Sequence, residues 1–236
     1  MAVLRGRFIT LEGGEGVGKT TNLAFVRDWL KERGIDCLMT REPGGTPLAE
    51  DIRELLLCHR EETVSDLTEL LLIFAARAQH IDQVIKPALA AGQWVLCDRF
   101  TDATFAYQGG GRQMDWACIE TLQQLVQGTL QPDMTLYLDM AVGDGLKRVR
   151  QRGVPDRFES QDESFFHRVR EAYQRRAQSS PERFRSVDAS QPLDAVQRQL
   201  AAVLEQFWSS LEREDSLERG GDSDLNRNPG ESSHNG

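Results

Sequence analysis

A glycine-rich loop at residues 13–20 constrains this chain more than any other feature of its sequence. The eight residues run Gly-Gly-Glu-Gly-Val-Gly-Lys-Thr and match the pattern G-x-x-x-x-G-K-[ST] of phosphate-binding loops. An apolar, β-prone run at residues 8–11 precedes the loop, and residues 21–32 after it are expected to form a helix. Strand, loop and helix in this order predict an α/β protein that binds a nucleoside triphosphate.

The residue types in this loop suit nucleotide phosphates. Glycines let backbone N–H groups turn toward phosphate oxygens, and the following helix presents the positive end of its dipole. Lys19 is expected to reach the β- and γ-phosphates, and the Thr20 hydroxyl is expected to hold Mg²⁺. The expected ATP-binding residues are Gly13, Gly14, Glu15, Gly16, Val17, Gly18, Lys19 and Thr20.

Composition limits the class of protein and its partners. The chain has 236 residues, of which 39% are hydrophobic and 28% charged, as expected of a globular domain. Its formal net charge of −9 argues against non-specific nucleic-acid binding, which needs a basic surface. We expect neither export nor membrane insertion, because no apolar run suits a signal peptide or a membrane span. The four cysteines form no C-x-x-C pair, which favours reduced thiols in a cytoplasmic protein.

Apolar runs alternate with longer helical patterns along the chain, which predicts βαβ units and a parallel sheet. The expected strands are residues 8–12, 36–40, 94–98, 135–139 and 184–188. The longest helical stretch, residues 67–91, is apolar on more than one face, so we expect it to be buried in the domain or in a subunit contact. We expect residues 1–211 to form the domain, and the polar residues 212–236 to be a disordered tail.

Polar and basic residues follow several of the expected strands, where parallel α/β sheets bind their ligands. Arg41 begins an Arg-Glu-Pro-Gly-Gly-Thr run after the second strand, Asp98 and Arg99 end the third, and residues 148–157 hold several arginines. Phosphoryl transfer between two phosphates needs metal, lysine and arginine to offset their mutual repulsion. The pattern therefore favours a kinase whose acceptor is already phosphorylated. A GTPase is disfavoured, because the chain has no N-K-x-D run.

At these residues the chain resembles the thymidylate kinase family over about residues 7–208. The matching motifs are the phosphate loop, the run at residues 41–46, Asp98-Arg99, the Ala-Tyr-Gln-Gly run at residues 106–109, and Arg-Gly…Asp-Arg at residues 152–157. The resemblance implies a three-layer P-loop nucleoside monophosphate kinase fold, with a five-stranded parallel sheet and a short lid near residues 148–160. It also implies Mg²⁺-dependent, in-line phosphoryl transfer from ATP to dTMP, yielding dTDP for dTTP synthesis, by a cytoplasmic homodimer.

The resemblance further assigns roles around the phosphate loop. Glu15 matches a carboxylate near the 3′-hydroxyl of the acceptor, and Asp98 matches an acid that supports Mg²⁺ together with Thr20. Gly16 stands where one type of the family has an arginine, so the chain is similar to the bacterial type, whose lid supplies arginines to ATP. The expected catalytic residues are Lys19, Arg99, Glu15, Arg152 and Arg157. Which of the lid arginines contacts the transferred phosphoryl group stays open.

Other residues are expected to bind the acceptor. Arg41 and Arg99 would hold the phosphates, because a guanidinium fork fits phosphate oxygens. By the resemblance, Arg77 would donate to the thymine carbonyl, with an aromatic ring one turn earlier stacked on the base. Ile73 and Phe74 lie four and three residues before Arg77, so either can share its face, and the choice between them stays open. The remaining expected nucleoside contacts are Thr104, Tyr107 and Gln108.

Two other functions stay open at the level of sequence. A related kinase with a different acceptor base would differ around Arg77, Thr104 and Tyr107, whose ring would crowd a ribose 2′-hydroxyl. A nucleotide-gated binding module would hydrolyse slowly and ignore mononucleotides. Because a phosphate acceptor is already an anion, little general base catalysis is needed. The histidines therefore receive no role: His59, His80, His167 and His234.

Overall fold

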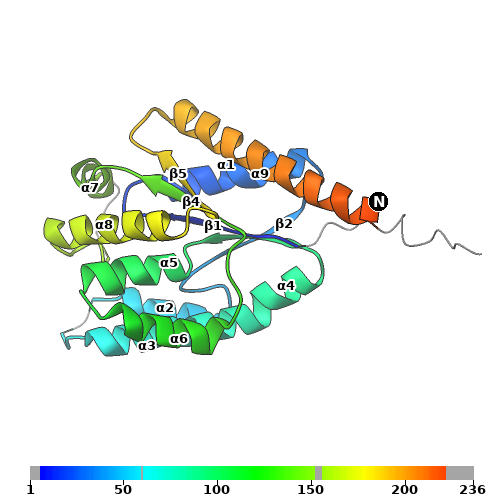
Figure 1. Cartoon of the computed structure of the whole chain (residues 1–236). Helices are drawn as coiled ribbons and strands as arrows, with labels where there is room; N and C mark the ends of the chain where they lie inside the picture. The colour runs from blue at the N-terminus through cyan, green and yellow to red at the C-terminus, as the bar shows by residue number, and fades with distance from the viewer. Residues whose placement is uncertain (1–5, 60, 152–155, 222–236) are drawn as a thin grey trace, which may run out of the picture.

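Five parallel strands form the centre of the fold (Figure 1). The computed structural model describes residues 6–59, 61–151 and 156–221. The strands lie in the order β2-β3-β1-β4-β5, so β1, which leads into the phosphate loop, is central. Their bounds are β1 (Phe8–Gly13), β2 (Cys37–Arg41), β3 (Trp94–Asp98), β4 (Met134–Asp139) and β5 (Phe184–Asp188). Each end lies within one residue of its expected position, and the predicted α/β class is confirmed.

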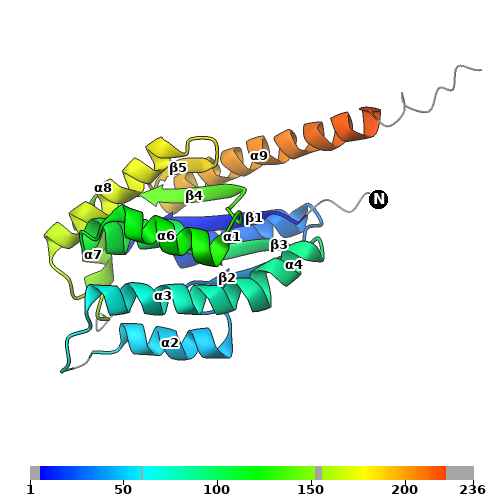
Figure 2. The ribbon, with the colours of Figure 1, turned by 60° about the horizontal axis from the view of Figure 1, so that its bottom comes forward.

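Helices cover both faces of the sheet (Figures 1 and 2). On one face, α1 (Lys19–Glu32) and α9 (Leu193–Gly221) bury the apolar side chains that alternate along β1, including Ile9 and Leu11. On the other side lie α2 (Pro47–Leu57), α3 (Asp66–His80), α4 (Lys86–Ala90), α5 (Thr101–Thr104), α6 (Trp116–Gln127) and α8 (Glu163–Ser179). The short α7 (Val142–Arg150) follows β4 at the carboxyl edge of the sheet. This edge is where ligands of parallel α/β folds bind.

The long helical stretch expected at residues 67–91 contains a change of helix type. Helix α3 continues through a π-helical turn, η1 (Ile81–Ile85), into α4. Pro87 explains the change, because proline has no N–H and its ring clashes with the carbonyl four residues earlier in an α-helix. A π-helical turn before the proline widens the ladder and removes that clash.

The C-terminal helix α9 runs to Gly221 and passes residue 212, where the sequence analysis places the start of a disordered tail. Its apolar residues recur at helical spacing as far as Leu211, which is only 2% exposed. Leu211 is the last residue of the expected domain, and α9 continues beyond it. Residues 222–236 of the expected tail lie outside the described residues. Among the described helices, none combines the length and the apolar character that crossing a bilayer demands.

Candidate active site

The phosphate loop lies between the end of β1 and the start of α1. Lys19 is the first residue of α1, and its ammonium group donates to the carbonyl oxygens of Gly14 at 3.0 Å and Gly13 at 3.3 Å. Burial, and then the nearby Arg99, lower the pKa of Lys19 from its ordinary value. The free N–H groups at the start of α1 face the loop, and this positive helix end favours bound phosphate.

Helix α7 packs directly on the phosphate loop. Gly16 has a φ of +75°, and a Cβ added there would collide with the carbonyl oxygen of Gly145. A Cβ added at Gly145 would collide in turn with the carbonyl oxygen of Glu15. One turn further along α7, Arg148 Nη1 lies 3.5 Å from the Gly16 carbonyl oxygen. Without a side chain at position 16, the helix can therefore rest on the loop and bring an arginine to it.

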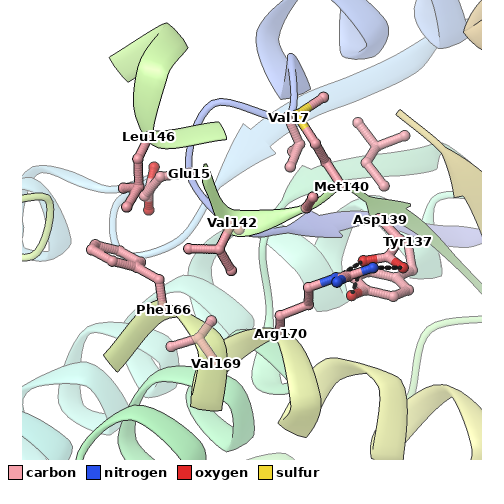
Figure 3. Close-up of a pocket in the computed structure, with 13 residues that line it drawn as sticks. Glu15, Val17, Tyr137, Asp139, Met140, Val142, Leu146, Phe166, Val169 and Arg170 are labelled. Atoms are coloured by element: carbon pink, nitrogen blue, oxygen red, sulfur yellow. Dashed lines mark hydrogen bonds and ion pairs between the residues drawn. The ribbon is translucent and has the colours of Figure 1, made fainter. Parts of the chain in front are cut away.

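A cavity of about 360 Å³ lies beneath α7, between the loop and α8 (Figure 3). Its apolar wall consists of Val17, Met140, Val142, Leu146, Phe166 and Val169. At one end Arg170 donates to the two carboxylate oxygens of Asp139, at 2.7 and 3.0 Å. Burial alone would raise the pKa of Asp139, but the hydrogen bonds from Arg170 lower it. The Asp139 carboxylate thus ties β4 to α8.

Glu15 also borders a larger pocket of about 600 Å³, which we call the acceptor pocket. Its walls come from the loop after β2, from α2 and α3, from the turn and helix after β3, and from residues 156–158. The π-helical turn η2 (Phe105–Gly111), which continues α5, supplies part of this wall. Six expected acceptor contacts line the pocket: Ile73, Arg77, Arg99, Thr104, Tyr107 and Gln108.

Glu15, Arg99 and Tyr107 form a hydrogen-bonded triangle between the loop and the pocket. Arg99 Nη2 donates to Glu15 Oε1 at 2.5 Å and to the Tyr107 hydroxyl oxygen at 2.9 Å. The Tyr107 hydroxyl donates to the same Glu15 oxygen at 2.6 Å. Burial alone would raise the pKa of Glu15, but Arg99 and Lys19 lower it to about 2. The carboxylate therefore stays ionised near neutral pH and holds Arg99 at the junction of loop and pocket.

A strained turn aims Arg99 at this junction. Arg99 has a φ of +65°, a left-handed conformation that residues with a Cβ rarely adopt. The Phe100 N–H donates to Glu12 Oε1 at 2.7 Å, and the Tyr173 hydroxyl donates to Glu12 Oε2 at 2.8 Å. Burial, together with the nearby Asp102 carboxylate, raises the pKa of Glu12 to about 8. Glu12 therefore ties β1 to the strained turn and stabilises it.

Arg77 is buried at another part of the pocket wall. Its Nε donates to Glu42 Oε2 at 2.7 Å, and its Nη2 donates to Thr104 Oγ1 at 3.0 Å. Its Nη1 is buried and has no hydrogen-bond partner among the described residues. His80 Nδ1 lies 3.0 Å from Glu42 Oε1, and His80 Nε2 lies 2.6 Å from Thr40 Oγ1. A histidine outside the expected motifs therefore orients Glu42. One guanidinium nitrogen of Arg77 is left for a ligand.

The structure separates the two candidates for the stacking position. Ile73 lines the acceptor pocket, whereas Phe74 is 2% exposed and packs in the core with Leu70 and Phe105. The Phe74 ring lies under Arg77, with 4.8 Å between the guanidinium carbon and the ring centroid. Of the two candidates left open by the sequence, Ile73, four residues before Arg77, therefore shares the pocket face with it, and contact of either residue with the acceptor remains a prediction. The aromatic rings that do line the pocket are Phe100, Tyr107 and Phe158.

Arg41, the first residue expected to hold the acceptor phosphate, lies outside the pocket lining. It ends the edge strand β2, its side chain is 53% exposed, and its Nη2 pairs with Glu50 at 2.8 Å. Arg53 on α2 lines the pocket instead and donates from Nη1 to the Pro43 carbonyl oxygen at 2.9 Å. Burial, and then Arg41 and Arg99, lower the pKa of Arg53, as expected for clustered cations.

Sequence reasoning missed Arg53, although a signal was present. Helix α2 begins after Thr46, whose hydroxyl caps the N–H of Ala49 at 3.2 Å. Ala49 and Leu56 are buried, and position 53 lies four residues after the one and three before the other. Positions with this spacing share a helix face. An arginine on the inward face of a helix that follows a strand end is therefore a recognisable candidate.

A buried carboxylate on α3 accepts a hydrogen bond from Gln108, which lines the pocket. Glu69 is fully buried and accepts from Gln108 Nε2 at 2.8 Å and from Arg112 Nη2 at 3.2 Å. It also pairs with Arg157 Nη2 at 2.7 Å. We call this group the Glu69 cluster: Glu69, Gln108, Arg112 and Arg157.

The Glu69 cluster changes the expectation for Arg157. Its Nη2 pairs with Glu69, and its Nε donates to the Leu56 carbonyl oxygen at 2.7 Å. The side chain is therefore engaged on α2 and α3 rather than at the phosphate loop, where contact with ATP was expected. Arg152 lies among residues 152–155, which are outside the described residues. On α7, Arg148 is the arginine that the structure places against the loop.

Thr20 and Asp98, the expected metal contacts, lie at the start of α1 and the end of β3. Asp98 Oδ1 is buried and has no hydrogen-bond partner in the described part of the chain. Over the same residues, no group of three or more His, Cys, Asp or Glu side chains is placed to hold a metal by itself. One hydroxyl and one carboxylate fit Mg²⁺, which commonly takes its other ligands from phosphates and water.

A phosphate loop that shares Glu15 with a second, arginine-bearing pocket places two anionic ligands end to end. On a five-stranded parallel sheet, this arrangement defines the class of P-loop nucleoside monophosphate kinases. Comparison with known proteins narrows the class. A family model described as thymidylate kinase matches residues 11–200, and the chain belongs to the thymidylate kinase family.

Individual relatives agree with the family model. The chain is 59% identical to the thymidylate kinase of Teredinibacter turnerae over 204 residues, which cover 86% of this chain and 100% of that protein. It is 60% identical to the thymidylate kinase of Chromohalobacter salexigens over 207 residues, which cover 87% and 98% of the two chains. The crystal structure of thymidylate kinase from Ehrlichia chaffeensis superimposes with a TM-score of 0.69 at 33% identity, covering 85% of this chain and 98% of that one. The chain is therefore a kinase with the fold of this family.

Proposed function

We propose that this kinase transfers the γ-phosphoryl group of ATP to dTMP by direct in-line displacement, giving dTDP for dTTP synthesis. Family membership and the relatives over nearly the whole domain support this reaction. ATP would lie on the phosphate loop and dTMP in the acceptor pocket, so that their phosphates meet beside Glu15 and Arg99. A phosphate oxygen of dTMP forms the new bond to phosphorus while the bond to the β-phosphate oxygen of ATP breaks.

The proposed roles of the cations follow from their positions. Lys19 exchanges the Gly13 and Gly14 carbonyl oxygens for the β- and γ-phosphates of ATP. Arg99, between loop and pocket, contacts the transferred phosphoryl group, and Arg53 contacts the phosphate of dTMP. Arg152, beyond the end of α7, remains a proposed ATP contact from its match to the family pattern.

Two carboxylates have proposed roles beside these cations. Glu15 orients Arg99 and accepts from the 3′-hydroxyl of dTMP, which its position at the pocket border allows. Mg²⁺ would be held by the Thr20 hydroxyl and by Asp98, whose buried oxygen Oδ1 lacks a described partner. When bound with ATP, the ion offsets negative charge on the β- and γ-phosphates.

The choice of base rests on one observation: Nη1 of Arg77 is buried and has no hydrogen-bond partner among the described residues. A buried, charged donor without a partner is costly, and a carbonyl oxygen at the edge of a pyrimidine would satisfy it. Thymine and uracil offer such a carbonyl, whereas cytosine offers an amino group at the corresponding edge. Tyr107 is fixed by Glu15 and Arg99, and its ring would crowd a ribose 2′-hydroxyl, which favours a deoxynucleotide.

A comparison of acceptors tests this function. ADP formation with ATP and Mg²⁺ is measured for dTMP, dUMP, UMP, dCMP and dGMP at equal concentrations. We expect the highest kcat/KM for dTMP, a lower value for dUMP, and much lower values for the others. Replacing Arg77 with Met should remove most of the preference for dTMP over dCMP. A purine acceptor preferred by the wild-type chain would contradict the proposed function.

We also propose that the enzyme is a cytoplasmic homodimer. Helices α3 and α6 lie side by side on one flank of the molecule (Figure 2). They expose large apolar side chains, with Leu67 at 54%, Leu71 at 48% and Leu125 at 79%. A second copy packed against this flank would bury them. Sedimentation of the wild type and of Leu71→Glu checks the proposal, because the charged variant should shift the protein toward the monomer.

A further inference from the structure

The segment of residues 156–161 forms part of the acceptor pocket although it is far from the rest of the pocket in sequence. Asp156 and Phe158 line the pocket. Asp156 Oδ1 accepts from the N–H groups of Phe158 and Glu159, both at 2.8 Å, so the segment is a tight turn with little internal freedom. The Phe158 ring meets the Tyr107 ring edge-on, with 6.2 Å between the centroids. Phe158 therefore faces the part of the pocket proposed to hold the nucleoside.

Phe158 packs against two hydrophobic clusters, and the polar contacts that fix this turn in the described chain converge on Glu69. Arg157 donates from its backbone N–H to the Leu57 carbonyl oxygen at 3.3 Å and from Nε to the Leu56 carbonyl oxygen at 2.7 Å. Its Nη2 pairs with Glu69 at 2.7 Å. Arg112, a second partner of Glu69, donates from Nη1 to Gln161 at 2.8 Å. Both ends of the turn are thus attached, directly or through Arg112, to Glu69.

Glu69 is the buried carboxylate that pairs with both arginines of the cluster, whereas the half-exposed Asp66 pairs with Arg112 alone at 3.6 Å. Glu69 is fully buried, and the side chains of Arg112 and Arg157 are only 15% and 16% exposed. Two poorly hydrated guanidinium groups this close together repel each other unless an anion lies between them. Gln108, which lines the pocket, donates to the same carboxylate at 2.8 Å. Glu69 therefore joins two separate walls of the pocket.

We propose that Glu69 is a positioning residue for acceptor binding, which acts through Arg157 on Asp156 and Phe158 and through Gln108 on the opposite wall. Arg157 is then a positioning residue as well, and not a contact of the transferred phosphoryl group. This inference rests on the proposed role of the acceptor pocket. It leads to a specific kinetic signature: loss of the pair weakens dTMP binding but leaves the chemical step and ATP binding largely intact.

Four proteins test the inference: the wild type, Glu69→Gln, Arg157→Gln and the double variant. For each, kcat and the KM values of dTMP and ATP are measured, together with the Kd of dTMP by calorimetric titration. We expect each single variant to raise the KM and Kd of dTMP about tenfold, with kcat and the KM of ATP changed less than threefold. The Kd of dTMP for the double variant should be no higher than that of the more impaired single variant, because both substitutions break the same connection.

Asp133→Asn is the matched control. Asp133 also holds an arginine, Arg7, and accepts the Phe8 N–H at 2.7 Å, but it lies at the opposite end of β1 from the phosphate loop. This variant should lower the melting temperature without changing the KM of dTMP. If Glu69→Gln does not fold, Glu69→Asp and Arg157→Lys replace it in the test. Both keep the charges, but one shortens the side chain and the other removes the forked guanidinium group, so the KM of dTMP should rise by a smaller factor.

Three results would overturn the inference. A fall in kcat of more than tenfold in Arg157→Gln alone, with Glu69→Gln unchanged, would place Arg157 at the phosphates. An unchanged Kd of dTMP in both single variants would show that the cluster is purely structural. If the fold-changes in Kd of the two single variants multiplied in the double variant, the two residues would act separately. If even the wild type failed to bind dTMP, the proposed role of the pocket itself would be rejected.

Discussion

The phosphate loop and the acceptor pocket meet at Glu15, yet they are built in opposite ways. The loop is one run of eight residues, and its lysine bonds to carbonyl oxygens only five and six residues away. The pocket takes its lining from residues 15 to 158, and its charged groups are oriented by partners on other elements. Glu42 orients Arg77 across 35 residues, and Glu12 holds the Phe100 N–H across 88.

Because the two regions are built differently, substitutions in the loop and in the pocket should change the kinetics in different ways. A local loop binds phosphates that every nucleoside triphosphate carries, so its residues should affect turnover with any acceptor. A pocket assembled from distant segments carries the selectivity, so its residues should affect the acceptor alone. Arg99 lies on the border and should affect both.

The largest effect is expected in the loop. Lys19→Ala should lower kcat by about 10³-fold with every acceptor, because the charge opposite the transferred phosphoryl group is lost. The KM of dTMP should stay within threefold of the wild type. Steady-state kinetics at saturating ATP check this, with Lys31→Ala at the other end of α1 as the control. A fall in kcat with only one of the acceptors would contradict the assignment of acceptor selectivity to the pocket alone.

Arg99→Ala should have the next largest effect. Turnover should fall by about 10²-fold and the KM of dTMP should rise, because the guanidinium group contacts both regions. Thermal unfolding should change little, since Glu15 keeps Lys19 and the Tyr107 hydroxyl nearby. The surface variant Arg33→Ala, which loses an exposed pair with Glu205, is the control. An unaffected rate would remove Arg99 from the mechanism.

A smaller effect distinguishes Arg53 from Arg41. Arg53→Ala should raise the KM of dTMP about tenfold, because a charge-assisted contact to the acceptor phosphate is lost. Arg41→Ala should change it less than threefold, since the Arg41 side chain is 53% exposed and paired with Glu50. The two variants are compared by initial rates over a range of dTMP concentrations. The reverse ranking would restore the role that the sequence pattern gives to Arg41.

The smallest effect concerns stability. It arises at Glu12, which accepts the N–H of Phe100 next to Arg99. Glu12 has its pKa raised to about 8 by burial, then by Asp102, whereas its ordinary value is 4.5. The native state therefore binds the proton more tightly than the unfolded state does. The contribution of Glu12 to stability is complete below the ordinary pKa and is lost as the pH rises toward 8.

Glu12→Gln isolates this effect, because glutamine fills the same space but does not titrate. Between about pH 6 and pH 7, the wild type should lose on the order of 1 kcal/mol of unfolding free energy relative to the variant. Urea unfolding at several pH values measures the difference, and Thr10→Val, a buried substitution on the same strand, is the control. Wild-type and Glu12→Gln curves that run parallel across this range would show that Glu12 stays ionised in the native state.

Much of the fold was predictable because its signals are local. Apolar runs of five or six residues set the strands to within one residue. Gly34 and Gly92, with φ of +74° and +76°, follow the ends of α1 and α4, as glycines commonly do. What was not predicted is detail within and beyond the helices. Helix α9 continues past residue 211, and a π-helical turn at residues 81–85 precedes Pro87.

The candidate site could be proposed only in part from the sequence. Motifs point to the loop, Arg77, Arg99 and Tyr107, and the structure brings these three side chains to one pocket beside Glu15. The choice between Ile73 and Phe74 stayed open in the sequence, because neighbouring helix positions differ in direction by about 100° and only the packing shows which one faces the pocket. Arg157 was expected at the phosphates because of its place in the lid pattern, but its partner Glu69 lies 88 positions away and carries no motif.

The close packing of Gly145 against Gly16 has a consequence for how the protein is made. All eight residues of the loop leave the ribosome early, but the helix that packs on them is synthesised more than a hundred residues later. A nascent chain that already carries the whole motif therefore still lacks the surface that supports it. Native-like capture of ATP phosphates would then report the completion of the second half of the domain, even though every residue of the motif belongs to the first.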